Sequence, residues 1–183
     1  LNSEKLINKV KSYNKFLNPD KLNKAYDFAV KAHKNQKRDS GDPYSNHPIA
    51  VANILTELKL DSATIATGLL HDTIEDTHAT YETIKNEFGQ EVADLVDGVT
   101  KISVFENQAT TTSKAENFRK LILATSKDIR VLLVKIADRL HNMRTINAII
   151  KTEKKERIAK ETMEIYAPLA DRMGMHRIRD ELE

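Results

Sequence analysis

The 183-residue sequence contains no cysteine and no tryptophan, and it has only five glycines and four prolines. The absence of cysteine excludes disulfide bonds and every metal site that is built on thiolates. Helix-breaking residues are scarce, whereas Leu, Ile, Ala, Lys and Glu are abundant, so the composition favours an all-α fold. A chain of this length is most simply one domain with one core.

Neither charge sign dominates the sequence, because 29 Lys and Arg residues face 27 Asp and Glu residues. A net charge of +2 provides no general attraction to nucleic acid or to anionic lipid. No apolar run approaches the roughly 20 residues that cross a bilayer, and no signal peptide opens the chain. We therefore expect a soluble, cytoplasmic protein that binds neither nucleic acid nor a membrane.

Helical periodicity extends over most of the chain. The expected helices cover about 20–35, a segment from Pro48, a segment from Asp61 or Ser62 into 69–77, about 80–88 up to Gly89, about 90–97, a segment from Ser113, 129–140 and about 157–172. Segment 129–140, "IRVLLVKIADRL", is the longest apolar run and predicts a central buried helix. Segments 37–46 and 103–112 are expected to be loops, and the charged segment 151–161 a solvated surface. Gly174 is expected to separate the last long helix from a short tail helix.

Four ionisable residues stand close together in "LLHDTIEDT" (69–77), directly after an apolar helix. On a continuous helix His71 lies one turn from Glu75, and Asp72 lies one turn from Asp76. The four side chains then form a polar wedge beside the apolar face, where charges are costly unless they are paired or bind a cation. By itself this pattern is also compatible with exposed side chains that form only weak contacts.

Two other stretches place a metal-binding side chain at the edge of an apolar element. His47 precedes a helix in "YSNHP", and Asp138 lies late in the most apolar helix, where Asn142 and Thr145 share its face. Together with the His-Asp pair of the first motif they make two imidazoles and two carboxylates. This set suits Mn²⁺, Fe²⁺ or a similar octahedral ion better than a closed structural zinc site. Water on such an ion has a lowered pKa and can attack phosphorus.

Six blocks of the sequence, in order, resemble the hydrolase domain of the RelA/SpoT-type enzymes, which belong to the HD-superfamily metal phosphohydrolases. The blocks are "RDSGDPYSNHP", "GLLHDTIEDT", "LVDGVTKI", "AENFRKLILA", "VLLVKIADRLHNMRT" and "EIYAPLADRMGM". The resemblance covers the chain from about residue 20 to the end. It implies an all-α HD-domain helical bundle that binds one Mn²⁺ and hydrolyses the 3′-pyrophosphate of the alarmones ppGpp and pppGpp, giving GDP or GTP.

The resemblance also implies roles for individual residues. The implied metal ligands are His47, His71, Asp72 and Asp138. The implied catalytic residues, which act on the nucleophilic water, are Glu75 and Asp76. The positions implied to line the nucleotide pocket are Arg38, Ser40, Tyr44, Asn142 and Thr145. Asp39 departs from the pattern, because many members carry a basic residue there. Among the other histidines, we expect His33 and His176 at the surface, His78 in a turn, and His141 in support of a metal ligand.

The closing segment, about 163–183, resembles the start of the connection to a synthetase domain in the long bifunctional enzymes. We therefore expect a single hydrolase domain over 1–183 that derives from a longer parent chain with synthetase and regulatory domains. Three alternatives remain open. They are an HD phosphohydrolase for deoxynucleotides or cyclic dinucleotides, an inactive HD module that binds nucleotide or a partner, and a helical nucleic-acid adaptor.

Overall fold

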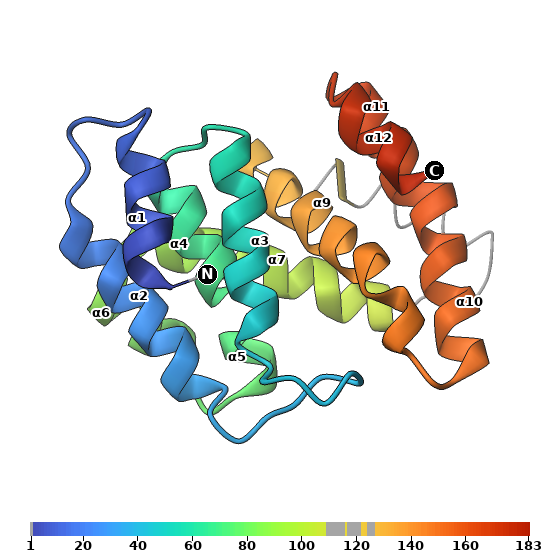
Figure 1. The fold of residues 1–183 in the computed structure, drawn as a ribbon, viewed down its shortest axis with the longest axis horizontal. Coiled ribbons are helices and arrows are strands. Elements are labelled where there is room, and N and C mark those ends of the chain that lie inside the picture. Colours follow the sequence, from blue (N-terminus) through green and yellow to red (C-terminus); the bar gives the residue numbers. More distant parts are fainter. Residues whose placement is uncertain (1, 109–115, 117–121, 124–126) are drawn as a thin grey trace.

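The computed structural model describes residues 2–108, 116, 122–123 and 127–183, and these ranges are built almost entirely of helices (Figure 1). Within them there is no β-strand, only one isolated bridge between Lys37 and Pro43. The all-α prediction is therefore confirmed. The helix expected from Ser113 lies largely outside the described residues. Nowhere in the described ranges is a helix both long enough and apolar enough to cross a membrane.

The described helical elements lie mainly in two parts of the chain, residues 3–108 and residues 129–182. The helices of the first part are α1 (Ser3–Lys11), α2 (Pro19–Ala32), α3 (Asn46–Glu57), α4 (Ser62–Leu70), α5 (Thr73–Asp76), α6 (Tyr81–Phe88) and α7 (Gln90–Gln108). Those of the second part are α9 (Ile129–Arg144), the 3₁₀ turn η1 (Ile146–Ala148), α10 (Thr152–Glu161), the π-helical segment η2 (Thr162–Tyr166), α11 (Ala167–Arg172) and α12 (His176–Leu182). The boundaries have local causes. The Thr80 hydroxyl caps α6 by accepting from the Thr83 amide, and Gly89, at φ +92°, ends that helix.

Helix α9 is the central buried helix that the apolar run predicted. It packs against α3, α4 and α7 on one side and against η2 and α12 on the other, and Figure 1 shows it between α3 and the C-terminal helices. Helices α3 and α4 approach each other closely at Gly68, where a Cβ atom would lie 2.7 Å from Leu55 Cδ1. The carboxyl end of α4, the first turn of α3 and the middle of α9 meet at one place in the core.

Three of the expected boundaries are wrong. The helix expected through 69–77 ends at Leu70, and a turn at His71 and Asp72 leads into the separate short helix α5. The loop expected from residue 103 is helical as far as Gln108, because α7 continues there with Ile102 and Ser103 buried. The helix expected over 157–172 begins earlier, as α10, and changes into the π-helical segment η2 at Thr162.

Two further residues or segments differ from expectation. Helix α1 was not predicted, although it buries Leu6, Ile7 and Val10 at helical spacing. His33 is not at the surface: only 1% of it is exposed, its ring lies 4.7 Å from that of Tyr44 and its Nδ1 lies 3.0 Å from Gln36 Oε1.

The charged segment 151–161 was predicted correctly as a solvated surface, because α10 has no buried residue.

Candidate functional site

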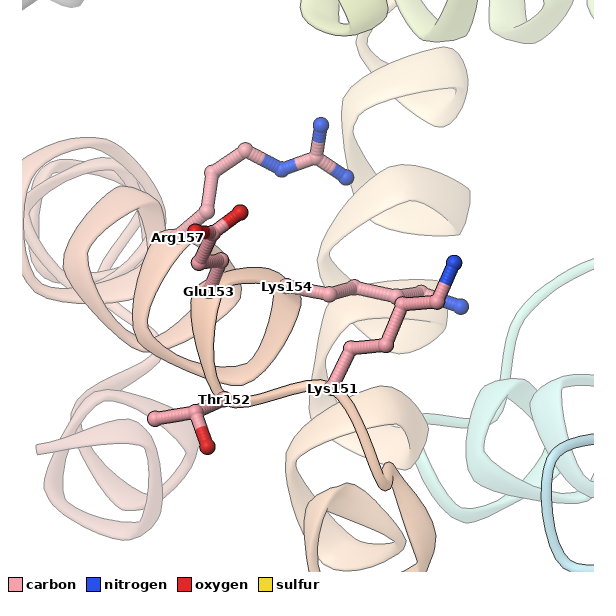
Figure 2. Close-up of a pocket in the computed structure, with 5 residues that line it drawn as sticks. All are labelled: Lys151, Thr152, Glu153, Lys154 and Arg157. Carbon is pink, nitrogen blue, oxygen red and sulfur yellow. The ribbon is translucent and has the colours of Figure 1, made fainter.

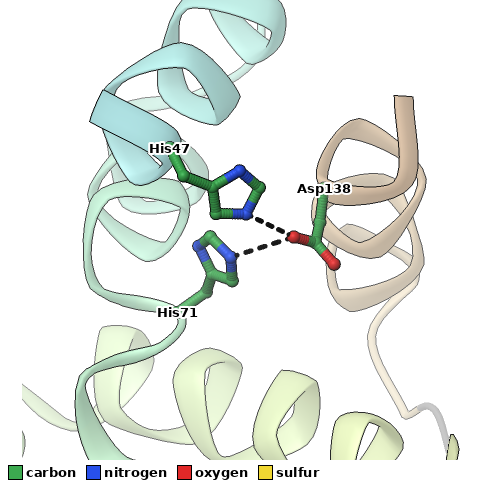
Figure 3. Close-up of side chains that lie close together, drawn as sticks. All are labelled: His47, His71 and Asp138. Atoms are coloured by element: carbon green, nitrogen blue, oxygen red, sulfur yellow. Dashed lines mark hydrogen bonds and ion pairs between the residues drawn. The ribbon is translucent and has the colours of Figure 1, made fainter. Parts of the chain in front are cut away.

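Three metal-binding side chains from separate elements converge where α3, α4 and α9 meet (Figure 3). His47 lies in the first turn of α3, His71 directly follows α4, and Asp138 lies in α9. Asp138 Oδ1 lies 2.6 Å from His47 Nε2 and 3.3 Å from His71 Nε2. All three residues are buried, and one ligand atom of each lies within 4.8 Å of the others. This spacing is compatible with a single shared metal ion.

Asp72, the fourth predicted ligand, lies beside this group of three without belonging to it. Its Oδ2 lies 3.1 Å from His71 Nε2 and 3.8 Å from His47 Nε2. The turn between α4 and α5 is responsible for this position, since Asp72 precedes the first residue of α5 without capping that helix through its side chain. The carboxylate is therefore directed to the two imidazoles instead of to the backbone amides.

Hydrogen bonds on the far side of each ring orient the two imidazoles. His71 Nδ1 lies 2.6 Å from the carbonyl oxygen of Gly68, an acceptor, so Nδ1 carries a proton and Nε2 is the nitrogen that faces the cluster. His47 Nδ1 lies 2.7 Å from His141 Nδ1. Burial, with help from the neighbouring His47 and Arg38, lowers the pKa of His141 to about 4, which keeps it neutral. A neutral His141 can accept the proton of His47 Nδ1, and this leaves Nε2 of His47 facing the cluster.

The charges of the cluster are strongly coupled. Burial lowers the pKa of His47 by more than the nearby Asp138 raises it. Burial acts in the same direction on His71, but the carboxylates of Asp72 and Asp138 outweigh it and raise the pKa of His71 well above its ordinary value. Burial tends to raise the pKa of Asp72, yet the adjacent His71 lowers it to about 2. The carboxylates are thus held ionised, as ligands of a divalent cation have to be.

Helix α5 places two more carboxylates beside the cluster. Glu75 and Asp76 are exposed, and neither belongs to the group of three residues whose ligand atoms converge. Partial burial and the neighbouring carboxylates raise the pKa of both side chains. The Tyr44 hydroxyl donates to Asp72 Oδ2 at 2.9 Å and lies 3.2 Å from Asp76 Oδ2, so it connects the cluster with the acidic pair. Raised basicity beside a metal site is typical of a proton acceptor.

A pocket of about 470 Å³ opens over the cluster and the acidic pair. All five residues expected to line a nucleotide pocket lie on its wall, namely Arg38, Ser40, Tyr44, Asn142 and Thr145. The guanidinium of Arg38 donates to Thr145 Oγ1 at 3.2 Å and to Asn142 Oδ1 at 3.4 Å. Across the opening, Asp39 accepts from Lys154 Nζ at 2.9 Å. The residues predicted from separate motifs therefore form one continuous surface.

A second hollow, of about 690 Å³, surrounds the start of α10 and adjoins this opening. Figure 2 shows the five residues that line it, which are Lys151, Thr152, Glu153, Lys154 and Arg157. Lys154 and Arg157 line both hollows. Lys37 and Arg38 stand on the other wall of the first pocket. These four cationic side chains lie among the carboxylates of Asp39, Glu153 and Glu161, so the walls offer separate positively charged groups that can pair with phosphates.

Sequence reasoning did not find the charged network beneath the pocket. Lys135 and Arg139 are buried and Glu106 is half-buried, and all three line the pocket. The sequence does indicate Lys135 and Arg139, because charged side chains within the apolar segment 129–140 need partners when they are buried. No sequence pattern indicates Glu106, since it lies in a segment without clear periodicity.

The sequence matches one protein family over most of its length. Residues 25–176 match the family described as HD domain. A GTP pyrophosphokinase rsh of Brucella melitensis is 55% identical over 178 residues, which are 97% of this chain and 24% of that protein. A GTP pyrophosphokinase of Myxococcus xanthus is 58% identical over 167 residues, 90% of this chain and 22% of that protein.

A third relative is named as a hydrolase as well as a synthase. The bifunctional (p)ppGpp synthase/hydrolase SpoT of Escherichia coli K12 is 52% identical over 163 residues, 89% of this chain and 23% of that protein. The chain thus spans about a quarter of the length of the curated relatives it matches. A solved structure, described as a metazoan ortholog of SpoT that hydrolyzes ppGpp and plays a role in starvation responses, superposes with a TM-score of 0.69. The superposition covers 86% of this chain and 89% of the solved one. At 24% sequence identity, it shows that the two chains share a fold.

Proposed function

The chain belongs to the HD-domain family, among its RelA/SpoT-type members, and on this basis we propose that it is a Mn²⁺-dependent hydrolase of ppGpp and pppGpp. The products are GDP or GTP and pyrophosphate. The observation that carries the proposal is the convergence of His47, His71 and Asp138 from three elements, beside a pocket that also contains Glu75 and Asp76. The matched relatives, one of them named a (p)ppGpp synthase/hydrolase, support the choice of substrate.

The donor set fits a divalent cation such as Mn²⁺. Two imidazole Nε2 atoms and a carboxylate oxygen face one another, the second carboxylate, from Asp72, stands beside them, and no thiolate is present. Mixed nitrogen and oxygen donors with open positions are typical of octahedral first-row ions. When bound, such an ion lowers the pKa of a coordinated water and neutralises charge on a phosphate.

The acidic pair handles the protons. In the reaction a water oxygen forms a bond to the phosphorus attached to the ribose 3′-oxygen, and the bond between that phosphorus and the 3′-oxygen breaks. Glu75 or Asp76 accepts the proton that the water loses, a role favoured by their raised pKa values. The carboxylate then gives this proton to the 3′-oxygen, so the nucleotide keeps a 3′-hydroxyl, and pyrophosphate is released with the oxygen of the attacking water. The Tyr44 hydroxyl lies within 3.2 Å of both Asp72 Oδ2 and Asp76 Oδ2 and so connects Asp76 with the cluster.

The pocket walls hold the nucleotide. Arg38 offers a planar guanidinium that can stack on a base or pair with a phosphate. Asn142 and Thr145 fix its orientation and supply further hydrogen-bonding groups. Lys154 and Arg157 add positive charge at the opening for the phosphates. We further propose that the segment of about 163–183 leads toward a synthetase domain in a longer parent chain.

One experiment tests the proposal. The purified chain is incubated with Mn²⁺ and a panel of ppGpp, pppGpp, dGTP and cyclic dinucleotides, and the products are separated and identified. We expect hydrolysis of the two alarmones alone, with pyrophosphate and no orthophosphate released. Release of orthophosphate from ppGpp would place the cut at the terminal phosphate, and turnover of dGTP or cyclic dinucleotides would place the chain with other HD phosphohydrolases. A chain that binds Mn²⁺ and ppGpp without turnover would be an inactive nucleotide-binding module.

A further inference from the structure

The ammonium group of Lys135 lies beneath the metal ligands. Lys135 is 3% exposed and stands one helical turn before Asp138 on α9. Its Nζ lies 3.0 Å from Ser103 Oγ, 3.1 Å from Asp138 Oδ2 and 3.4 Å from Glu106 Oε2. Three acceptors from two helices therefore surround a group with three N–H donors. A long, flexible side chain is held in one place by this arrangement.

Because of this contact, the two oxygens of Asp138 have different partners. Lys135 binds Oδ2, whereas Oδ1 is the oxygen that faces Nε2 of His47 and of His71. A carboxylate held at one oxygen cannot rotate about its terminal torsion to offer both oxygens, or the other one, to the metal. We propose, on the basis of the function proposed above, that Lys135 is a positioning residue that fixes Asp138 as a one-oxygen ligand.

Glu106 has two other partners besides Lys135. Glu106 Oε1 lies 2.8 Å from Arg139 NH2, and Glu106 Oε2 accepts from the Tyr166 hydroxyl. Its contact with Lys135 is also longer than the contact between Lys135 and Asp138. The ammonium thus lies nearer to the metal ligand than to Glu106, which also contacts Arg139 and Tyr166.

Charge alone predicts the opposite effect. A buried ammonium 3.1 Å from a ligand oxygen repels a dication, so its removal strengthens metal binding if Coulomb forces decide. If Lys135 acts by fixing the carboxylate, its removal weakens metal binding instead. The two explanations therefore differ in the sign of the change in affinity for Mn²⁺, and a binding measurement can separate them.

The experiment compares Lys135→Met with the double variant Lys135→Met/Glu106→Gln. The double variant removes one positive and one negative buried charge, so the net charge of the cluster stays the same and the fold is less perturbed. Lys101→Met is the matched control, because Lys101 is an exposed lysine on α7 whose removal changes the net charge without touching the site. Thermal melts verify folding, and calorimetric titration with MnCl₂ alone gives the dissociation constants.

We expect the dissociation constant for Mn²⁺ to rise about 10–100-fold in both Lys135 variants, the usual effect of removing a partner that orients a metal ligand, and to stay unchanged in Lys101→Met. In turnover assays, saturating Mn²⁺ should restore the KM for ppGpp while the Mn²⁺ activation constant stays raised. Tighter binding by Lys135→Met, or wild-type affinity in the double variant, would overturn the inference. Because the titration contains no nucleotide, failure to cleave ppGpp counts only against the proposed function.

Discussion

Removal of the metal by a chelator is expected to lower the melting temperature of the protein without unfolding it at 25 °C. The polar side chains of the cluster already pair with one another, since His47 Nε2 lies 2.6 Å from Asp138 Oδ1 and Lys135 Nζ lies 3.1 Å from Asp138 Oδ2. At a free Mn²⁺ concentration 100 times its dissociation constant, binding adds about 2.7 kcal/mol to the free energy of unfolding. For a domain of this size that corresponds to about 5–11 °C.

Thermal unfolding followed by circular dichroism measures this difference, with one sample in EDTA and another in excess Mn²⁺. His71→Ala is the control, because it lacks a ligand and should melt at the same temperature in both conditions. Coincident melts of the wild-type chain would show that the cluster binds no metal. A wild-type chain that is unfolded in EDTA at 25 °C would refute the reasoning that hydrogen bonds among the ligands hold the site together.

Two more predictions concern the carboxylates. The double variant Glu75→Gln/Asp76→Asn should bind Mn²⁺ within a few-fold of the wild-type affinity. Its kcat should fall by about 10²–10⁴, the usual cost of losing a general base. Loss of Mn²⁺ binding in calorimetry would instead show that these carboxylates are metal ligands. In the chelated protein the pKa of Asp72, about 2 against an ordinary 3.8, predicts about 2 kcal/mol of stability that is complete above about pH 4 and is lost as the pH falls toward 2. Urea unfolding across that range should show a shallower decline for Asp72→Asn, and parallel declines would contradict the assignment.

The sequence reveals most of this site because its residues are chemically out of place. An aspartate in "IRVLLVKIADRL" is costly in a buried helix, so the apolar residues around Asp138 are enough to indicate that its carboxylate has a partner. The end of an apolar helix at His71 and Asp72 gives the same signal. The central helix and the all-α class follow from apolar periodicity, which depends on local sequence alone.

The misplaced boundaries come from contacts between distant segments. Helix α7 continues past residue 103 although its periodicity weakens, and Glu106 there forms an ion pair with Arg139 of α9. Such a contact joins segments 33 positions apart and leaves no periodic trace. His33 is buried for a similar reason, because its ring packs on Tyr44, which comes from the following loop. Local patterns predict elements, whereas the way elements meet requires the assembled core.

The distance along the chain between the ligands has a consequence for the order of folding. His47 and Asp138 are separated by 91 positions, and each comes from a different helix of the core. Contacts of such high sequence separation form late, since loop closure has to precede them. A growing polypeptide that ends before α9 carries both histidines without their shared carboxylate. We therefore expect a divalent ion to bind after the core has assembled, because only then are the imidazoles and the carboxylate together.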